Sequence, residues 1–109
     1  GAYFVITGTT LDTRTANGGT RTTSGTTYTV SDGTWYRVNI TVNADATSIV
    51  FTLYSEAGAT LFTQTHTTNI PATSAFTGAG FVATNSGTTA VNIYYVDYQR
   101  FYSDRTLVR

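Results

Sequence analysis

TWYRVNITV (residues 34–42) and SIVFTLY (residues 48–54) decide the fold of this 109-residue chain. In the first stretch apolar side chains stand at every even position from Tyr36 to Val42, and the odd positions carry a different set. The second stretch alternates in the same way. An alternation with a period of two is typical of β-strands, whose successive side chains point to opposite faces. The polar turn at 43–47 between the two stretches indicates a strand–turn–strand unit.

The same pattern extends outward in both directions. Asn17-Gly18-Gly19 is a hairpin signal, because Asn and Gly tolerate the positive φ angles of tight turns. No stretch shows the 3.6-residue apolar period of a helix. Turns at intervals of roughly 8–12 residues predict an all-β fold, an antiparallel β-sandwich with about eight strands. Besides the two deciding stretches, the expected strands are 2–7, 11–16, 20–24, 26–30, 60–68, 79–84 and 90–102.

The composition excludes several classes of protein. The chain has 26 Thr and 15 aromatic residues, which favour strands, and it has no Lys, Met or Cys. A net charge of zero with 40% hydrophobic residues excludes disorder, and the lack of Cys excludes disulfides and thiolate metal sites. The six Arg are scattered, so we expect no nucleic-acid partner. The apolar runs are too short for a membrane span, so no membrane insertion is expected.

Catalytic machinery is not apparent, and we expect the chain not to be an enzyme. Hydrolysis of glycosidic bonds usually requires two facing carboxylates, but Glu56 is the only Glu and Asp97 has no acidic neighbour on its face. The single His, His66, is expected at the surface or rim of a strand. No cofactor is expected. For a bound Ca²⁺ ion, Asp32, Asn43 and Asp45 are candidates by residue type only, and the competing interpretation is that they simply favour turns.

Binding is the better prospect, because sugars are held by flat aromatic faces and planar hydrogen-bonding groups. Two strands offer such groups, and the competing interpretation is that the aromatic residues pack in the core or between subunits. The candidate glycan-binding residues are Trp35, Arg37 and Asn39 on one strand, and Tyr94, Tyr98 and Arg100 on another.

The expected organisation is one sandwich domain, residues 1–102, followed by a polar tail, residues 103–109. The strand 90–102 is apolar on both faces near its centre, which is typical of a strand covered on both sides. This pattern favours a homo-oligomer. Because the chain starts inside a strand, we expect it to be the C-terminal part of a longer protein.

The order of several motifs resembles a known family. The succession YFVITGTTL, NGGT, GTWYRVNITVNADATSIVFTLY, TTNIP and ATNSGTTAVNIYYVDY, spread over residues 2–101, is similar to jelly-roll modules of the concanavalin A-like lectin/glucanase type, particularly those of bacteriophage tail-fibre and head-fibre proteins. The catalytic E-x-D-x-x-E pattern of the glucanase branch is absent. The chain is also shorter than a full module, so strands from an upstream segment or a neighbouring subunit would be needed to complete the sandwich.

This resemblance implies a function at the virion surface, outside the cell. The module would bind host-surface polysaccharide without catalysis, beside other virion proteins and in a homo-oligomer, with a trimer favoured. Two alternatives remain open at this point. One is a purely structural decoration or assembly module of a virion. The other is a carbohydrate-binding module of a secreted glycosidase.

Overall fold

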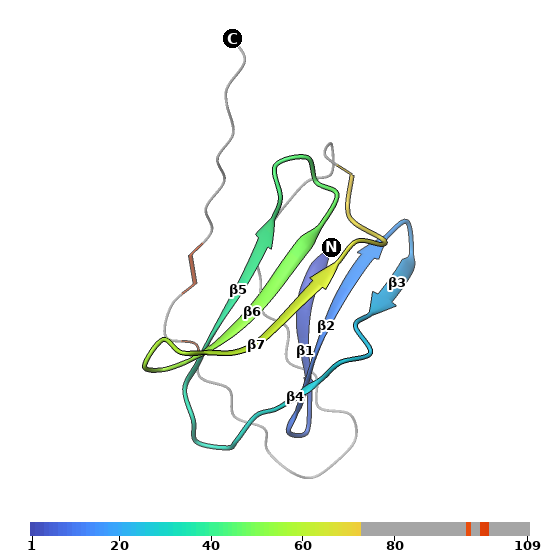
Figure 1. Cartoon of the computed structure of the whole chain (residues 1–109). Coiled ribbons are helices and arrows are strands. Elements are labelled where there is room, and N and C mark those ends of the chain that lie inside the picture. The colour runs from blue at the N-terminus through green and yellow to red at the C-terminus, as the bar shows by residue number, and fades with distance from the viewer. Residues whose placement is uncertain (73–95, 97–98, 101–109) are drawn as a thin grey trace. The chain divides into compact units, whose positions relative to one another are not determined.

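The computed structural model of the chain describes residues 1–72, 96 and 99–100 (Figure 1). The chain divides into two compact units, Gly1–Phe76 and Thr77–Arg109. All described strands belong to the first unit. Within the described residues there is no helix, and hence none long and apolar enough to cross a membrane. The prediction of an all-β chain is therefore confirmed for this part of the molecule.

The first sheet has four antiparallel strands, named here sheet A. β1 (Ala2–Thr7) pairs with β2 (Thr10–Asn17), which pairs in turn with β3 (Thr20–Thr23) and, nearer its start, with the short β4 (Tyr28–Thr29). The predicted hairpin between β2 and β3 is present. Gly18 and Gly19 both have positive φ, as the two central residues of a type I′ turn require.

The second sheet, sheet B, contains the two stretches that decided the fold. β5 (Tyr36–Val42), β6 (Ile49–Ser55) and β7 (Thr60–His66) form an antiparallel meander in that order. The register between β5 and β6 is continuous from Tyr36 opposite Ser55 to Val42 opposite Ile49. Each side chain of β5 therefore has a partner of known identity on β6, and the two faces of the sheet follow directly.

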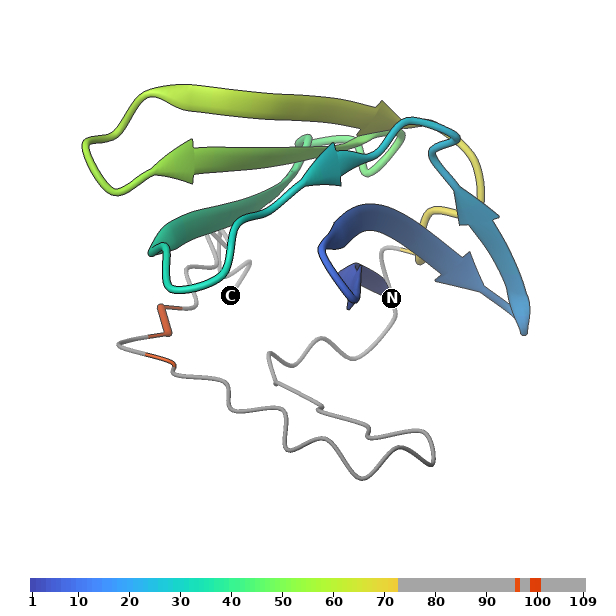
Figure 2. The same cartoon turned by 90° about the horizontal axis from the view of Figure 1, so that it is seen from below.

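The two sheets pack face to face, with sheet B as one layer and sheet A as the other (Figure 2). Leu11 of β2 packs with Leu53 of β6 and Phe62 of β7 at the centre of the core. Phe4 of β1 meets Phe51 of β6 edge to face, with ring centroids 5.3 Å apart. The burial of large apolar side chains from both layers is the main stabilising contribution to such a fold.

One row of apolar side chains departs from this pattern. Val38, Ile40 and Val42 of β5 lie on the same face of sheet B as the buried Leu53, Phe51 and Ile49 of β6. They are nevertheless 51%, 38% and 52% exposed. Alternation assigns a residue to a face of its sheet, but the extent of the opposite layer decides whether that position is covered.

Several expectations concern the later part of the chain. The predicted strand 79–84 and most of the predicted strand 90–102 lie outside the described residues, as does the tail 103–109. Of the strand 90–102, only Val96, Gln99 and Arg100 are described, and these three are exposed and do not belong to a strand.

Candidate functional site

The outer face of sheet B, turned away from sheet A, is the candidate site. Its side chains form rows across the strands. Arg37 lies opposite Tyr54, Asn39 lies opposite Thr52, and Thr52 lies opposite Thr63 of β7. Strands are roughly 4.8 Å apart and same-face side chains roughly 7 Å apart along a strand, so these groups form a grid comparable in scale with sugar rings. The outer face, as named here, comprises Arg37, Asn39, Thr41, Val50, Thr52, Tyr54, Leu61, Thr63 and Thr65.

An arginine and a tyrosine form the most specific feature of this face. The guanidinium carbon of Arg37 lies 4.5 Å from the centroid of the Tyr54 ring, which is a cation–π geometry. Arg37 is exposed, whereas Tyr54 is half-buried. The guanidinium therefore lies over a half-buried ring, while the Arg37 side chain itself remains exposed.

The adjoining groups on the outer face are neutral hydrogen-bonding groups. The Asn39 amide donates to the Thr41 hydroxyl at 3.2 Å, and this contact orients the amide along the strand. Thr52 and Thr63 add hydroxyls that both donate and accept. Such groups match the hydroxyls of a sugar.

The sequence-predicted site residues divide into two groups. Arg37 and Asn39 are both exposed on the outer face, and Trp35, 48% exposed, directly precedes β5. Tyr94 and Tyr98 lie outside the described residues. Arg100 is exposed and belongs to the second compact unit, so it is described separately from this face.

Sequence reasoning did not select Tyr54. The signal that could have found it is the turn at 43–48, because equal strand lengths on either side of that turn place position 54 opposite Arg37. Alternation within one strand assigns faces, but only the pairing register identifies a partner on the next strand.

The turn between β5 and β6 shows how two of the calcium candidates are used. Asp45 Oδ1 accepts hydrogen bonds from the Thr47 backbone N–H at 3.1 Å and from the Thr47 hydroxyl at 2.8 Å, and the Asn43 amide also donates to it. The Ser48 N–H donates to Asn43 Oδ1 at 2.8 Å. These bonds, first the Thr47 hydroxyl, lower the pKa of Asp45.

The Asp45 and Asn43 side-chain oxygens therefore stabilise the turn by accepting hydrogen bonds within it, as carboxylate and amide side chains commonly do. In the described parts of the chain, no three His, Cys, Asp or Glu side chains gather as metal ligands. Asp32, the third candidate, is exposed in the turn before β5.

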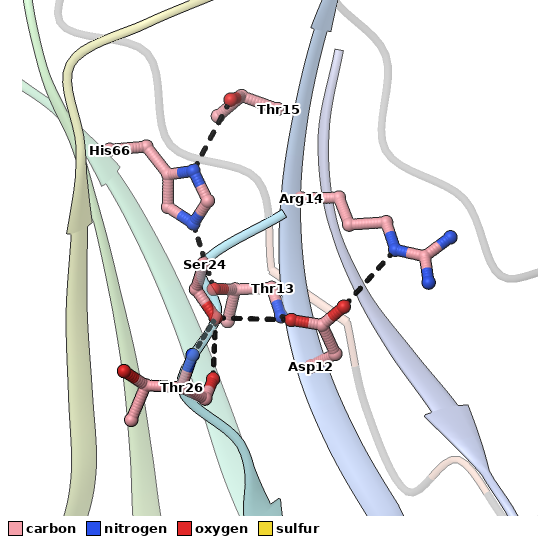
Figure 3. Close-up of polar contacts among 7 residues, drawn as sticks. All are labelled: Asp12, Thr13, Arg14, Thr15, Ser24, Thr26 and His66. Carbon is pink, nitrogen blue, oxygen red and sulfur yellow. Dashed lines mark hydrogen bonds and ion pairs between the residues drawn. The ribbon is translucent and has the colours of Figure 1, made fainter. Parts of the chain in front are cut away.

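The expectation that His66 lies at the surface or rim is wrong. His66 is only 4% exposed and lies between the sheets, hydrogen-bonded to two threonines of β2 (Figure 3). It shares the inner face of β7 with Phe62, and the ring of Phe51 meets it edge to face. The Thr-rich inner face of β2 supplies polar partners, and these allow a His to replace an apolar residue there.

The hydrogen bonds of this buried cluster assign the tautomer of His66. The Thr15 hydroxyl donates to the Thr68 carbonyl at 2.9 Å, so toward His66 Nδ1, 3.4 Å away, it accepts. Nδ1 therefore carries the proton. The Thr13 hydroxyl then donates to Nε2 at 2.9 Å. Both ring nitrogens are satisfied in the neutral state, which leaves His66 no free lone pair for a substrate.

The Asp12 carboxylate, whose charge acts on His66, lies on the other side of β2 and is paired with Arg14. Burial lowers the pKa of His66, and the Asp12 carboxylate opposes this effect. Asp12 forms an ion pair with Arg14 on the outward side of sheet A, with 3.2 Å between Oδ2 and Nε. Burial raises the pKa of Asp12, but hydrogen bonds from the Thr13 N–H, Arg14 and Ser24 outweigh it, so the net change is downward.

Comparison with known families identifies the domain type. The family model described as SO2946-like, C-terminal domain, matches residues 1–97. The chain belongs to this family. No curated protein and no solved structure matches the chain. This SO2946-like domain thus includes all of β1–β7, and with them the whole outer face.

Proposed function

We propose that this SO2946-like domain is a non-enzymatic module that binds glycans through the outer face of sheet B. The observation that carries the proposal is the placement of Arg37, Asn39 and Tyr54 together on the outer face of sheet B, with Trp35 directly before β5 in the chain. The aromatic ring of Trp35 offers a face for the C–H groups of a sugar. The amide and hydroxyl rows offer partners for its O–H groups.

The proposal includes a setting for this activity. The module would lie at the surface of a bacteriophage virion, bind host-surface polysaccharide and contact other virion proteins as a homo-oligomer, with a trimer favoured. Its two sheets would belong to a concanavalin A-like jelly roll of about eight strands. These elements rest on the sequence resemblance. Several copies in one particle would turn weak single-site binding into firm attachment.

The absence of catalysis is part of the proposal. It is supported by the position of His66, the only His of the chain, which is buried with both ring nitrogens hydrogen-bonded. The one imidazole of the chain is therefore not available to a substrate as a general acid or base.

A glycan array tests the proposed function. The whole chain, as its natural oligomer, is applied to a panel that includes bacterial envelope polysaccharides. We expect binding that Trp35→Ala weakens at least several-fold, and Ile6→Ala leaves unchanged. Ile6 is a matched control, because it is 44% exposed and lies on the other sheet. Silence of the unaltered chain across the panel would refute glycan binding.

A specific observation favours a second candidate, the assembly module. The exposed apolar row of β5, Val38, Ile40 and Val42, is the kind of surface that marks contacts with other chains. Light scattering of the purified chain distinguishes the two functions. A stable oligomer that Ile40→Asp dissociates, together with a silent glycan array, would favour assembly.

A further inference from the structure

The charge on the outer face is unbalanced. Arg37 is its only charged side chain, since the other members of the face are Asn, Thr, Tyr, Val and Leu. In the part of the chain that the structure describes, the single ion pair joins Arg14 to Asp12 on sheet A, and no carboxylate pairs with Arg37. Among the described residues, the outer face therefore presents one positive charge to which no carboxylate is paired.

The stacking of Arg37 on Tyr54 determines which ligand chemistry this part of the face presents. A neutral sugar would use the open face of a tyrosine ring for C–H contacts. Here the guanidinium occupies the position over that ring, 4.5 Å from its centroid. What remains for a ligand is the planar edge of the guanidinium, whose parallel N–H groups match the two oxygens of a carboxylate.

The support from Tyr54 also reduces the entropic cost of binding. A free arginine side chain loses considerable rotamer freedom when it is immobilised. A guanidinium already stacked on a half-buried ring loses less. Beside it, the Asn39 amide and the Thr52 hydroxyl stand one row away and can bind the hydroxyls of the same or the next sugar.

We infer that the outer face recognises an acidic glycan, a polysaccharide whose sugar rings carry carboxylates. Arg37 binds the carboxylate, Tyr54 is the positioning residue for Arg37, and the Asn39–Thr52 row binds ring hydroxyls. This inference rests on the proposed function and adds the substrate class to it.

The test compares three polysaccharides of different charge chemistry, one carboxylated, one sulfated and one neutral. Calorimetric titrations of the whole chain use size-matched oligomers of polygalacturonate (carboxylate), dextran sulfate (sulfate) and dextran (neutral). We expect the carboxylated oligomer to bind tightest. Arg37→Gln should weaken that binding about tenfold or more, because a charge-assisted bidentate contact is lost. Dextran binding should be unaffected by the substitution.

Two further variants separate specific recognition from general effects. Arg21→Gln removes the same charge from an exposed position on β3 of sheet A and should leave all affinities unchanged. Tyr54→Leu keeps the charge of Arg37 but removes its support. This variant should reduce the ratio of carboxylate to neutral affinity, a readout that a merely structural change would not move. Thermal unfolding of each variant verifies that it is folded.

Failure of this inference differs from failure of the proposed function. If dextran binds as well as polygalacturonate and Arg37→Gln has no effect, the acidic specificity is refuted while glycan binding stands. Equal binding of dextran sulfate and polygalacturonate would reduce the effect to charge attraction and also overturn the carboxylate assignment. If neither these probes nor the glycan array shows binding, both proposals fall.

Discussion

Threonine hydroxyls lie on both sides of sheet B, in different surroundings. On the inner side, a histidine meets the Thr13 and Thr15 hydroxyls of β2 in a dry space between the layers, where every polar atom must be paired. On the outer side, threonines and an amide face solvent, where water can satisfy them. The comparison shows that a threonine hydroxyl completes the packing between the layers on one side and remains open to solvent on the other.

The largest expected effect contrasts two cross-strand partners on the inner face. Leu53 is fully buried, whereas its partner Val38 on β5 is 51% exposed. Leu53→Ala should lower the free energy of unfolding by about 2–5 kcal/mol, because it leaves a cavity in the core. Val38→Ala should lower it by less than about 1 kcal/mol. Urea denaturation measures both, and equal losses would show that Val38 is covered in the folded protein.

An intermediate effect is expected when one threonine hydroxyl is removed between the sheets and, for comparison, one is removed on the outer face of sheet B. Thr13→Val leaves His66 Nε2 as a buried acceptor without a donor, which should cost about 1–3 kcal/mol of the free energy of unfolding. Thr63→Val on the exposed outer face should change stability by about 0.5 kcal/mol or less. If the two substitutions change the free energy of unfolding equally, the distinction between a buried hydroxyl that must be paired and a solvent-exposed one is wrong.

The smallest effect is a dependence of stability on pH. The pKa of His66 is lowered in the folded state, so as the pH falls below about 6.5 the unfolded chain takes up a proton first. The contribution of neutral His66 to the free energy of unfolding is therefore fully present above that pH, and it is lost as the pH falls toward the folded-state pKa. Asp12 and Asp45, whose pKa values are also lowered, lose their contribution only at more acid pH, below about 3.8.

Unfolding curves at pH 8, 6 and 5 measure the histidine effect. His66→Gln removes the titrating group, and the pH dependence in this range should disappear even though the variant is less stable overall. If the pH dependence of stability persists in His66→Gln, another group causes it, and the role given to His66 is contradicted.

Much of the fold could be predicted, because strands and turns are encoded locally. The alternation in 34–42 and 48–54 led to β5 and β6, and the two glycines at 18–19 led to the β2–β3 hairpin. The site was predicted only in part. Arg37 and Asn39 follow from alternation within a single strand, but Tyr54 comes from a neighbouring strand and becomes visible only through the register.

The sequence by itself determined where most strands of the first 66 residues lie and, within each strand, which side chains share a face, because a pleated backbone imposes a period of two. Tertiary structure alone decided three things: that His66 is buried, that the apolar row of β5 is exposed, and that Arg37 stacks on Tyr54. The physical reason is the same in each case. Burial and contact depend on which side chain of another strand arrives opposite, and the spacing of residues within one strand does not contain that information.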